Sequence, residues 1–358
     1  MQEPIVTFRA VEKTYDGRAN VVQGLDLTVH RGEFLTLLGP SGSGKTTTLM
    51  MLAGFEAPTA GDIMLGNRSL ATVPAHRRSM GMVFQNYALF PHMTVAENLA
   101  YPLRRRRVGK AGIAHALARA VEMVKLQGLE GRYPAQLSGG QQQRVAVARA
   151  LIFEPELVLM DEPLGALDKN LREQMQLELK HLHAQLGTTI VYVTHDQSEA
   201  LTMSNRVAVF HQGRVQQIDA PELIYEQPAN SFVANFIGEN NTLPGRIEGQ
   251  DGRFCRVRLD NGETLLALAV NPGADGRTQV SIRPERLRLD HGGGSGNRLC
   301  ATVREIIYFG DHVRVHVEAG AAAIMLKLPL GAAAGLDAGT VITLACDPQH
   351  CRALDPLS

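Results

Sequence analysis

The sequence predicts an α/β domain built on a parallel sheet, residues 1–237, followed by a small all-β domain, residues 238–358. Two observations carry this prediction. In the first part, short apolar runs alternate with helix-like segments, and in the second part, short strand-like pieces are separated by turn residues. A chain of 358 residues is long enough for about two domains.

Four apolar runs in the first part are typical of strands that are buried on both faces, because they do not alternate polar and apolar residues. These runs are Phe34–Leu38, Met80–Phe84, Leu157–Met160 and Thr189–Val193. A helix-like stretch begins at Lys45, and others lie near 112–126, 140–153 and 170–186. Strands that alternate with helices favour an open α/β sheet.

The pattern changes after Asn235–Asn240. Strand-like stretches follow at 253–259, 279–289, 312–318 and 341–346, with turn residues such as Asp260-Asn261-Gly262 between them. This spacing predicts a small all-β barrel or sandwich. The run GGGSG, Gly292–Gly296, is expected to be a flexible loop within it.

Composition limits the classes of function. Lys+Arg and Asp+Glu are both 36, so the zero net charge gives no general electrostatic reason to expect nucleic acid as a partner. The four cysteines show no close pairing, and we expect reduced thiols rather than disulfides or a metal site: Cys255, Cys300, Cys346 and Cys351. The first residues lack the pattern of a secretion signal, and no apolar run reaches the ~18 residues of a membrane span. Any membrane part is therefore expected on another chain.

A glycine-rich loop between a predicted strand and a predicted helix points to phosphate binding. The stretch GPSGSGKTT matches G-x-x-x-x-G-K-[ST] in the strand–loop–helix context that this motif requires. Backbone N–H groups and a helix N-terminus suit an anion, while a lysine reaches the β- and γ-phosphates and a threonine hydroxyl ligates Mg²⁺. The sequence therefore predicts an ATP-binding loop made of Gly39, Pro40, Ser41, Gly42, Ser43, Gly44, Lys45, Thr46 and Thr47.

Two adjacent carboxylates, Asp161 and Glu162, end the apolar run that begins at Leu157. Buried charges are costly unless something uses them. Asp161 is expected to lie near the Mg²⁺ that Thr46 also ligates. Glu162 is then placed to polarise the water that attacks the γ-phosphate.

A second glycine-rich turn opens another predicted helix at LSGGQ, Leu137–Gln141. It provides a second anion-binding helix start. One nucleotide does not need two such sites in one chain, unless the second serves a nucleotide bound to another copy. The order of these motifs resembles that of the ATP-binding subunits of ABC transporters, and the resemblance covers essentially the whole chain.

The resemblance implies a nucleotide-binding domain with a helical subdomain, and an oligonucleotide-fold-like tail. It assigns further roles residue by residue. Tyr15 matches the aromatic residue that stacks on adenine, and Gln85 matches the glutamine that touches Mg²⁺ and its water and senses the membrane subunit. His195 matches the histidine that contacts the γ-phosphate. The residues that match the segments completing the partner's site and crossing the dimer interface are Ser138, Gly139, Gly140, Gln141 and Asp168.

The partners are also implied by the resemblance. Two copies would bind two ATP molecules head to tail, and two membrane permease subunits would dock near Gln85–His92 on the cytoplasmic face of the inner membrane. An external solute-binding protein would set specificity. The motifs look like those of importers of polyamines, ferric iron and sugars, and Val233–Ile247 most resembles the polyamine branch.

Two alternatives stay open. One is a soluble ABC-type ATPase that acts on DNA or ribosomes, with the tail as a nucleic-acid binder. Against it, the tail after residue 240 contains only Phe254, Tyr308 and Phe309 as Phe or Tyr, too few for the usual stacking platform. The other makes the tail a regulatory module that binds a signal protein or a small solute, which is compatible with the import function.

Overall fold

The computed structural model describes residues 3–290 and 296–356. The chain divides into two compact units, Met1–Glu222 and Leu223–Ser358, and each is described by itself. Of the loop expected at Gly292–Gly296, only Gly296 lies within the described residues.

The domain boundary expected at 237/238 falls inside the second unit. The cause is the buried Arg283 guanidinium, which donates to the carbonyl oxygens of Tyr225 (3.0 Å), Ala234 (2.9 Å) and Ile237 (2.6 Å). These bonds attach the segment before residue 238 to the second unit. These hydrogen bonds cannot be predicted from the spacing of apolar residues in the sequence.

The first unit is built around a six-stranded sheet of order β10-β9-β3-β8-β7-β6. All its neighbouring strands are parallel except β9 and β10. Its strands are β3 (Phe34–Leu38), β6 (Gly81–Val83), β7 (Leu157–Asp161), β8 (Thr189–Thr194), β9 (Arg206–His211) and β10 (Arg214–Asp219). The four strands expected from apolar runs are confirmed, as is the α/β class of this unit.

The two faces of this sheet belong to different cores, which explains why β3, β7 and β8 are largely apolar. In β7, Leu157 and Leu159 enter one core, while Val158 and Met160 enter the other. Successive strand residues point to opposite faces, so a strand covered on both sides has few polar positions.

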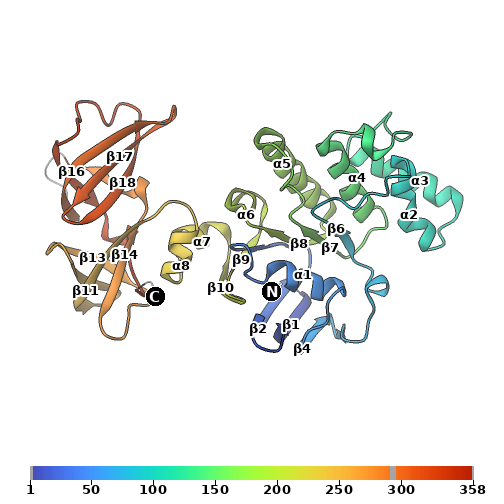
Figure 1. Ribbon diagram of the computed structural model, residues 1–358, viewed down its shortest axis with the longest axis horizontal. Coiled ribbons are helices and arrows are strands. Elements are labelled where there is room, and N and C mark those ends of the chain that lie inside the picture. The colour runs from blue at the N-terminus through green and yellow to red at the C-terminus, as the bar shows by residue number, and fades with distance from the viewer. Residues whose placement is uncertain (1–2, 291–295, 357–358) are drawn as a thin grey trace. The chain divides into compact units, whose positions relative to one another are not determined.

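Helices pack on both faces of the large sheet, and further helices extend the unit beyond the sheet (Figure 1). The helices are α1 (Lys45–Ala53), α2 (Val95–Arg105), α3 (Lys110–Met123), α4 (Gly139–Leu151), α5 (Lys169–Leu186) and α6 (Gln197–Met203), with short 3-10 turns at Ala75–Arg77 and Pro134–Gln136. Of these, α4 and α5 pack on one face of the large sheet and α1 packs on the other. Helices α2, α3 and α4 share a further core, so this part is a helical subdomain.

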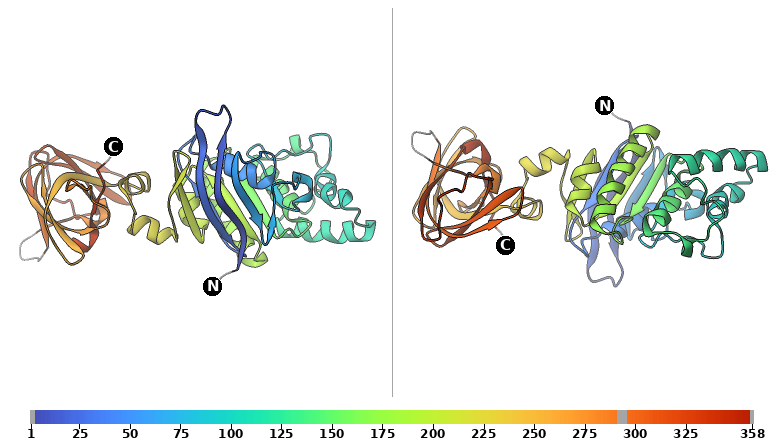
Figure 2. Two further views of the ribbon diagram at one scale, coloured as in Figure 1. Left: turned by 90° about the horizontal axis from the view of Figure 1, so that it is seen from below. Right: turned by 90° about the horizontal axis from the view of Figure 1, so that it is seen from above.

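A second, antiparallel sheet of order β2-β1-β4-β5 packs on the other face of the large sheet and shares a core with α1. Figure 2 shows β1 and β2 in dark blue on the side opposite to α5 and α6. The strands are β1 (Pro4–Thr14), β2 (Asn20–His30), β4 (Ala60–Leu65) and β5 (Arg68–Ser69). This layer is absent from the expectations drawn from the sequence.

The second unit begins with short helices and continues as two β structures around one apolar core. Five strands close a barrel in the order β11-β12-β13-β20-β14, and five form a sheet of order β15-β19-β16-β17-β18. The helices are α7 (Pro221–Glu226), which crosses the boundary, and α8 (Ser231–Phe236). The strands are β11 (Asn241–Asp251), β12 (Phe254–Leu259), β13 (Thr264–Ala269), β14 (Arg277–Ile282), β15 (Arg288–Leu289), β16 (Asn297–Tyr308), β17 (His312–Ala319), β18 (Ala322–Pro329), β19 (Val341–Cys346) and β20 (Cys351–Leu354). The all-β character expected for the tail is confirmed.

Across residues 3–290 and 296–356, no helix is both long and apolar enough to cross a bilayer. The four cysteines are free thiols, and the sulfur atoms of Cys346 and Cys351 lie 3.6 Å apart in the barrel unit.

Candidate functional site

The glycine-rich loop lies between the carboxyl end of β3 and the first residue of α1, as its sequence predicts. Lys45 is only 5% exposed, and its amine donates to the carbonyl oxygens of Gly39 and Pro40, both at 2.8 Å. Burial lowers the pKa of the Lys45 amine, while the nearby carboxylates Glu162 and Asp161 oppose that shift. The loop therefore surrounds a desolvated cation.

Two glycines of this loop are required by close packing. A Cβ atom at Gly39 would lie 2.3 Å from the carbonyl oxygen of Phe210, and one at Gly44 would lie 2.6 Å from that of Val21. Gly44 also has a φ of 99°, in the left-handed region that disfavours other residues. The pattern of glycines is thus fixed by the backbone around the loop.

The structure brings Thr46 and Asp161 together from distant parts of the chain. The Thr46 hydroxyl donates to Asp161 Oδ1 at 3.1 Å. Burial raises the pKa of Asp161, against the opposing effect of the hydrogen bond from Thr46. A hydroxyl and a carboxylate are hard oxygen donors, so this pair fits the Mg²⁺ that a nucleotide carries.

Glu162 is the centre of a three-residue cluster. Its Oε1 lies 3.0 Å from His195 Nδ1, and its Oε2 accepts from Gln85 Nε2 at 3.3 Å. The three residues follow different strands, β7, β8 and β6, which are neighbours in the sheet. The three catalytic candidates named from the sequence therefore converge on one carboxylate.

Two acidic residues not predicted from the sequence stabilise the chain on either side of His195. Asp196 caps α6 by accepting from the backbone N–H of Ser198 at 2.8 Å. The buried Glu199 accepts from the hydroxyls of Tyr192 (2.8 Å) and Thr194 (2.6 Å), on the strand that ends beside His195. The sequence does contain a signal for this helix start, because an aspartate three residues before a glutamate is typical of the first turn of a helix.

Ser138 and Asp168 both cap helices in the same unit. The Ser138 hydroxyl accepts from the N–H of Gln141 at 3.3 Å at the start of α4, and Asp168 accepts from the N–H of Leu171 at 3.0 Å at the start of α5. A Cβ at Gly140 would lie 3.1 Å from the Leu171 side chain. The two helix starts are therefore close neighbours, and Gly139 and Gly140 leave the room for this contact.

Two predicted site elements stay separate from the phosphate loop. Tyr15 is 61% exposed in the turn between β1 and β2, where the Lys13 amine lies 4.8 Å from its ring. Among the described residues, no hydrogen bond or ion pair joins Tyr15 or Ser138–Gln141 to Gly39–Thr47. A single chain thus holds one phosphate loop and, apart from it, a second glycine-rich helix start.

The loop expected to dock membrane subunits, Gln85–His92, is only partly available. Tyr87 is buried in the core of its own unit. The half-buried Phe90 ring lies 4.6 Å from the ring of Tyr101, which is exposed. Phe90 and Tyr101 therefore form a partly exposed aromatic pair, the first in this loop and the second on α2.

Comparison with protein families agrees with this geometry. Residues 22–165 match the family described as ABC transporter, and residues 280–354 match the TOBE domain.

Curated relatives cover nearly the whole chain. A spermidine/putrescine import ATP-binding protein, PotA, of Rubrobacter xylanophilus is 48% identical over 98% of this chain and 93% of its own length. The protein of the same name from Thermobifida fusca is 44% identical over 98% of this chain and 94% of its own.

Solved structures match about three fifths of the chain. A dimeric post-hydrolysis structure of the ATP-binding cassette MJ0796 bound to ADP and Pi is 32% identical, with a TM-score of 0.54, and the match covers 60% of this chain and 98% of that one. The cbiO1 protein from Clostridium perfringens, part of the ABC transporter complex cbiONQ, is 25% identical with a TM-score of 0.59, covering 62% and 91%.

The fold and the phosphate loop define a nucleotide-binding protein of the α/β class with a β-rich tail. The chain belongs to the family of ATP-binding subunits of ABC transporters.

Proposed function

We propose that this chain is the ATP-hydrolysing subunit that energises polyamine import through a membrane ABC transporter. The observation that carries the hydrolytic part is the position of Glu162, between Gln85 and His195 at the end of β7. The solute follows from the relatives, which are named for spermidine and putrescine import and match over almost the full chain. Ferric iron, a sugar or another small solute is the alternative cargo, because the imported solute need not touch this subunit.

The roles of the site residues follow from their chemistry. Backbone N–H groups of Gly39–Thr47 and the Lys45 amine hold the phosphates of ATP, and the exposed Tyr15 ring stacks on adenine. Thr46, Asp161 and Gln85 are the residues that would hold Mg²⁺, which neutralises charge on the phosphates.

The catalytic step is proton removal from water. Glu162 accepts this proton as the attacking oxygen approaches the γ-phosphate. His195 holds the Glu162 carboxylate from one side and reaches the γ-phosphate, while Gln85 holds it from the other. Glu162 is oriented by both contacts, so little rearrangement is needed when ATP arrives.

The functional unit is a head-to-tail pair of chains. Ser138, Gly139, Gly140 and Gln141 of one copy complete the nucleotide site of the other, and Asp168 lies at the interface between them. The dimeric solved relative bound to ADP and Pi supports such a pair. Two permease subunits dock near Gln85–His92, with this protein peripheral on the cytoplasmic face of the inner membrane, and an external binding protein delivers the solute.

Uptake of labelled solutes tests the proposal. The chain is expressed together with the permeases and the binding protein of a polyamine importer, in cells that lack polyamine import. Spermidine and putrescine should accumulate, and Lys45→Ala should reduce their uptake to background because it removes the phosphate-binding amine. Lys110→Ala, on exposed α3, should leave uptake unchanged. Uptake of iron or a sugar in place of polyamines would refute the proposed cargo and leave the ATPase role standing.

A further inference from the structure

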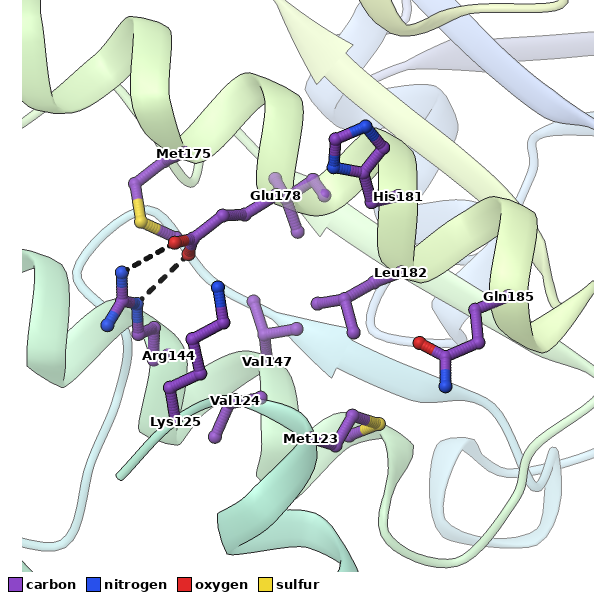
Figure 3. Close-up of a pocket in the computed structure, with 11 residues that line it drawn as sticks. Met123, Val124, Lys125, Arg144, Val147, Met175, Glu178, His181, Leu182 and Gln185 are labelled. Atoms are coloured by element: carbon purple, nitrogen blue, oxygen red, sulfur yellow. Dashed lines mark hydrogen bonds and ion pairs between the residues drawn. The ribbon is translucent and has the colours of Figure 1, made fainter. Parts of the chain in front are cut away.

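A cavity of about 130 Å³ lies in the first unit between the end of α3, α4 and α5 (Figure 3). It is well separated along the chain from the phosphate loop. The cavity lies where two apolar cores meet, because Val147 and Leu182 belong to the core on the large sheet and Val124 belongs to the core of the helical subdomain. None of the roles proposed above uses it.

The floor of the cavity is apolar. Val124, Val147 and Leu179 are buried, and Leu182 points toward the middle of the space (Figure 3). An apolar protein cavity of ~150 Å³ holds one benzene molecule. The volume between α4 and α5 thus suits a body of about one aromatic ring.

The rim of the cavity is charged, but most of its charge is internally neutralised. Arg144 donates twice to Glu178, from Nη2 at 2.7 Å and from Nε at 3.1 Å. Lys125 remains on the same rim, and its amine reaches toward the space beside this pair (Figure 3). Among the described residues, the Lys125 amine has no hydrogen-bond or ion-pair partner. Within the part of the chain that the structure describes, the opening therefore presents one uncompensated positive charge above an apolar floor.

The backbone at Lys125 is unusual for a lysine. Its φ is 56°, and the N–H groups of Lys125 and Leu126 donate to the carbonyl oxygens of Glu122 (3.1 Å) and Val121 (3.0 Å). These two bonds define the helix ending in which glycine is the usual left-handed residue. The Cβ atom disfavours a lysine in this left-handed conformation. The helix ending therefore gives no reason for a lysine side chain at this position.

We propose that this cavity binds a small monocarboxylate with an apolar body of about one ring. The body occupies the space over Val147 and Leu182, and the carboxylate pairs with the Lys125 amine. Among the described lining residues, a single free cation stands beside a mostly apolar surface, which suits one negative charge better than a phosphate, since a phosphate needs several donors. The bound acid lies between α4 and α5, the helices that begin at Ser138 and after Asp168.

Three small probes that share a benzyl group test the charge preference. Phenylacetate, benzyl alcohol and benzylamine are each titrated into the full-length protein without nucleotide, with binding followed by calorimetry. Phenylacetate should bind saturably, and about tenfold or more tightly than benzyl alcohol, because a hydrogen bond to a charged group adds that much affinity. Benzylamine should bind most weakly. Equal affinity for all three probes, or no saturable binding of phenylacetate, would overturn the proposal.

Variants separate the ligand contact from the fold. Lys125→Gly supplies the residue that the helix ending favours, so its unfolding temperature should equal or exceed that of the unchanged protein. Its affinity for phenylacetate should nevertheless fall about tenfold or more. Val147→Phe should abolish binding by filling the cavity, while Lys110→Gln is the matched control and should bind normally. Normal binding of phenylacetate by Lys125→Gly would show that the carboxylate does not pair with the Lys125 amine, and it would refute the proposal. The measurement needs no ATP, so its outcome is independent of the function proposed above.

Discussion

Glu162 occupies a backbone conformation that side chains rarely adopt. Its φ is 43°, in the left-handed region, and its N–H donates to the carbonyl oxygen of Val193 at 3.0 Å. Such a conformation costs on the order of 1–3 kcal/mol and persists only where neighbouring groups determine it. Here it directs the carboxylate toward Gln85 and His195. The strain is therefore located at the residue to which catalysis is assigned.

Glu162→Gln tests the assignment of the general base. Glutamine keeps the shape and much of the hydrogen bonding but cannot accept the proton of water. ATP should still bind, while turnover falls by roughly 10²–10⁴-fold. Nucleotide binding and phosphate release are measured on the same preparation. Near-normal turnover would show that another group takes the proton.

At this scale the sequence predicted the residues but not their arrangement. Asp161 and Glu162 follow an apolar run, and Lys45 and Thr46 lie in a recognisable loop, so their types and spacing were informative. The contact of Gln85 with Glu162 joins residues 77 positions apart. Pairings of this kind depend on the order of strands in the sheet, which residue spacing does not encode.

Among the elements, α4 has a second function besides presenting Ser138. Arg149, near its end, donates to the carbonyl oxygens of Tyr87 and Ala88, both at 2.9 Å. These two residues have φ values of 61° and 44°, so the loop after β6 turns through two left-handed residues in succession. Arg149 satisfies the carbonyl groups that this turn leaves without strand partners. The loop containing Gln85 is thereby attached to α4.

Arg149→Ala should destabilise the first unit by about 2–4 kcal/mol, because it leaves two backbone acceptors unsatisfied. Arg149→Lys should recover only part of this loss, since a lysine amine lacks the planar fork that reaches both carbonyls. Urea unfolding measures both variants.

Arg119→Ala is the matched control, because Arg119 pairs with Glu154 at the surface and exposed ion pairs contribute about 0–1 kcal/mol. If Arg119→Ala and Arg149→Ala lost equal stability, the loss would reflect general charge rather than support of the loop.

Strands and helices were predictable where their apolar pattern was regular. Four strands of the large sheet appeared as uniform apolar runs, because a core covers each of their two faces, and helices α3 to α5 appeared as helix-like stretches. The antiparallel layer was missed. In its strand β1, buried and exposed residues alternate only weakly, and the pairing with β2 has several register shifts. These irregularities obscure the two-residue alternation by which a half-buried strand is recognised in a sequence. The division into two compact units places the end of α7 and all of α8 with the β structures, where hydrogen bonds from Arg283 attach them. Apolar residues of both helices are also buried there, namely Ile224, Val233 and Ala234.

The whole molecule contains two glycine-rich helix starts that do not meet within one chain. α1 begins at Lys45 and α4 begins after Ser138, and both offer backbone N–H groups to an anion. The proposed pairing of two copies explains this duplication, because the second helix start of each chain completes the first site of the other. The sequence alone could suggest this pairing only through the family resemblance, because contacts between two chains cannot be derived from the residue pattern of one chain.

Mixed dimers distinguish this arrangement from two self-contained sites. Lys45→Ala removes the phosphate-binding amine, and Ser138→Arg fills the space where the partner's γ-phosphate would lie. Each homodimer should be nearly inactive, because both of its sites are damaged. In a mixed dimer, both lesions fall on one composite site, and the other site keeps an intact Lys45 and an intact Ser138.

If one sound site can hydrolyse ATP, mixing the two inactive proteins should restore part of the turnover. If both sites must act together, labelled nucleotide should still be trapped at the sound site, to about half the occupancy of the unmodified dimer on a two-site count. Heterodimer formation is verified by differential tags, and mixing two differently tagged Lys45→Ala preparations is the control, which should show neither effect. Self-contained sites predict the same result for the Lys45→Ala and Ser138→Arg mixture as for that control. Heterodimers without turnover and without trapped nucleotide would therefore refute sites completed by the partner chain.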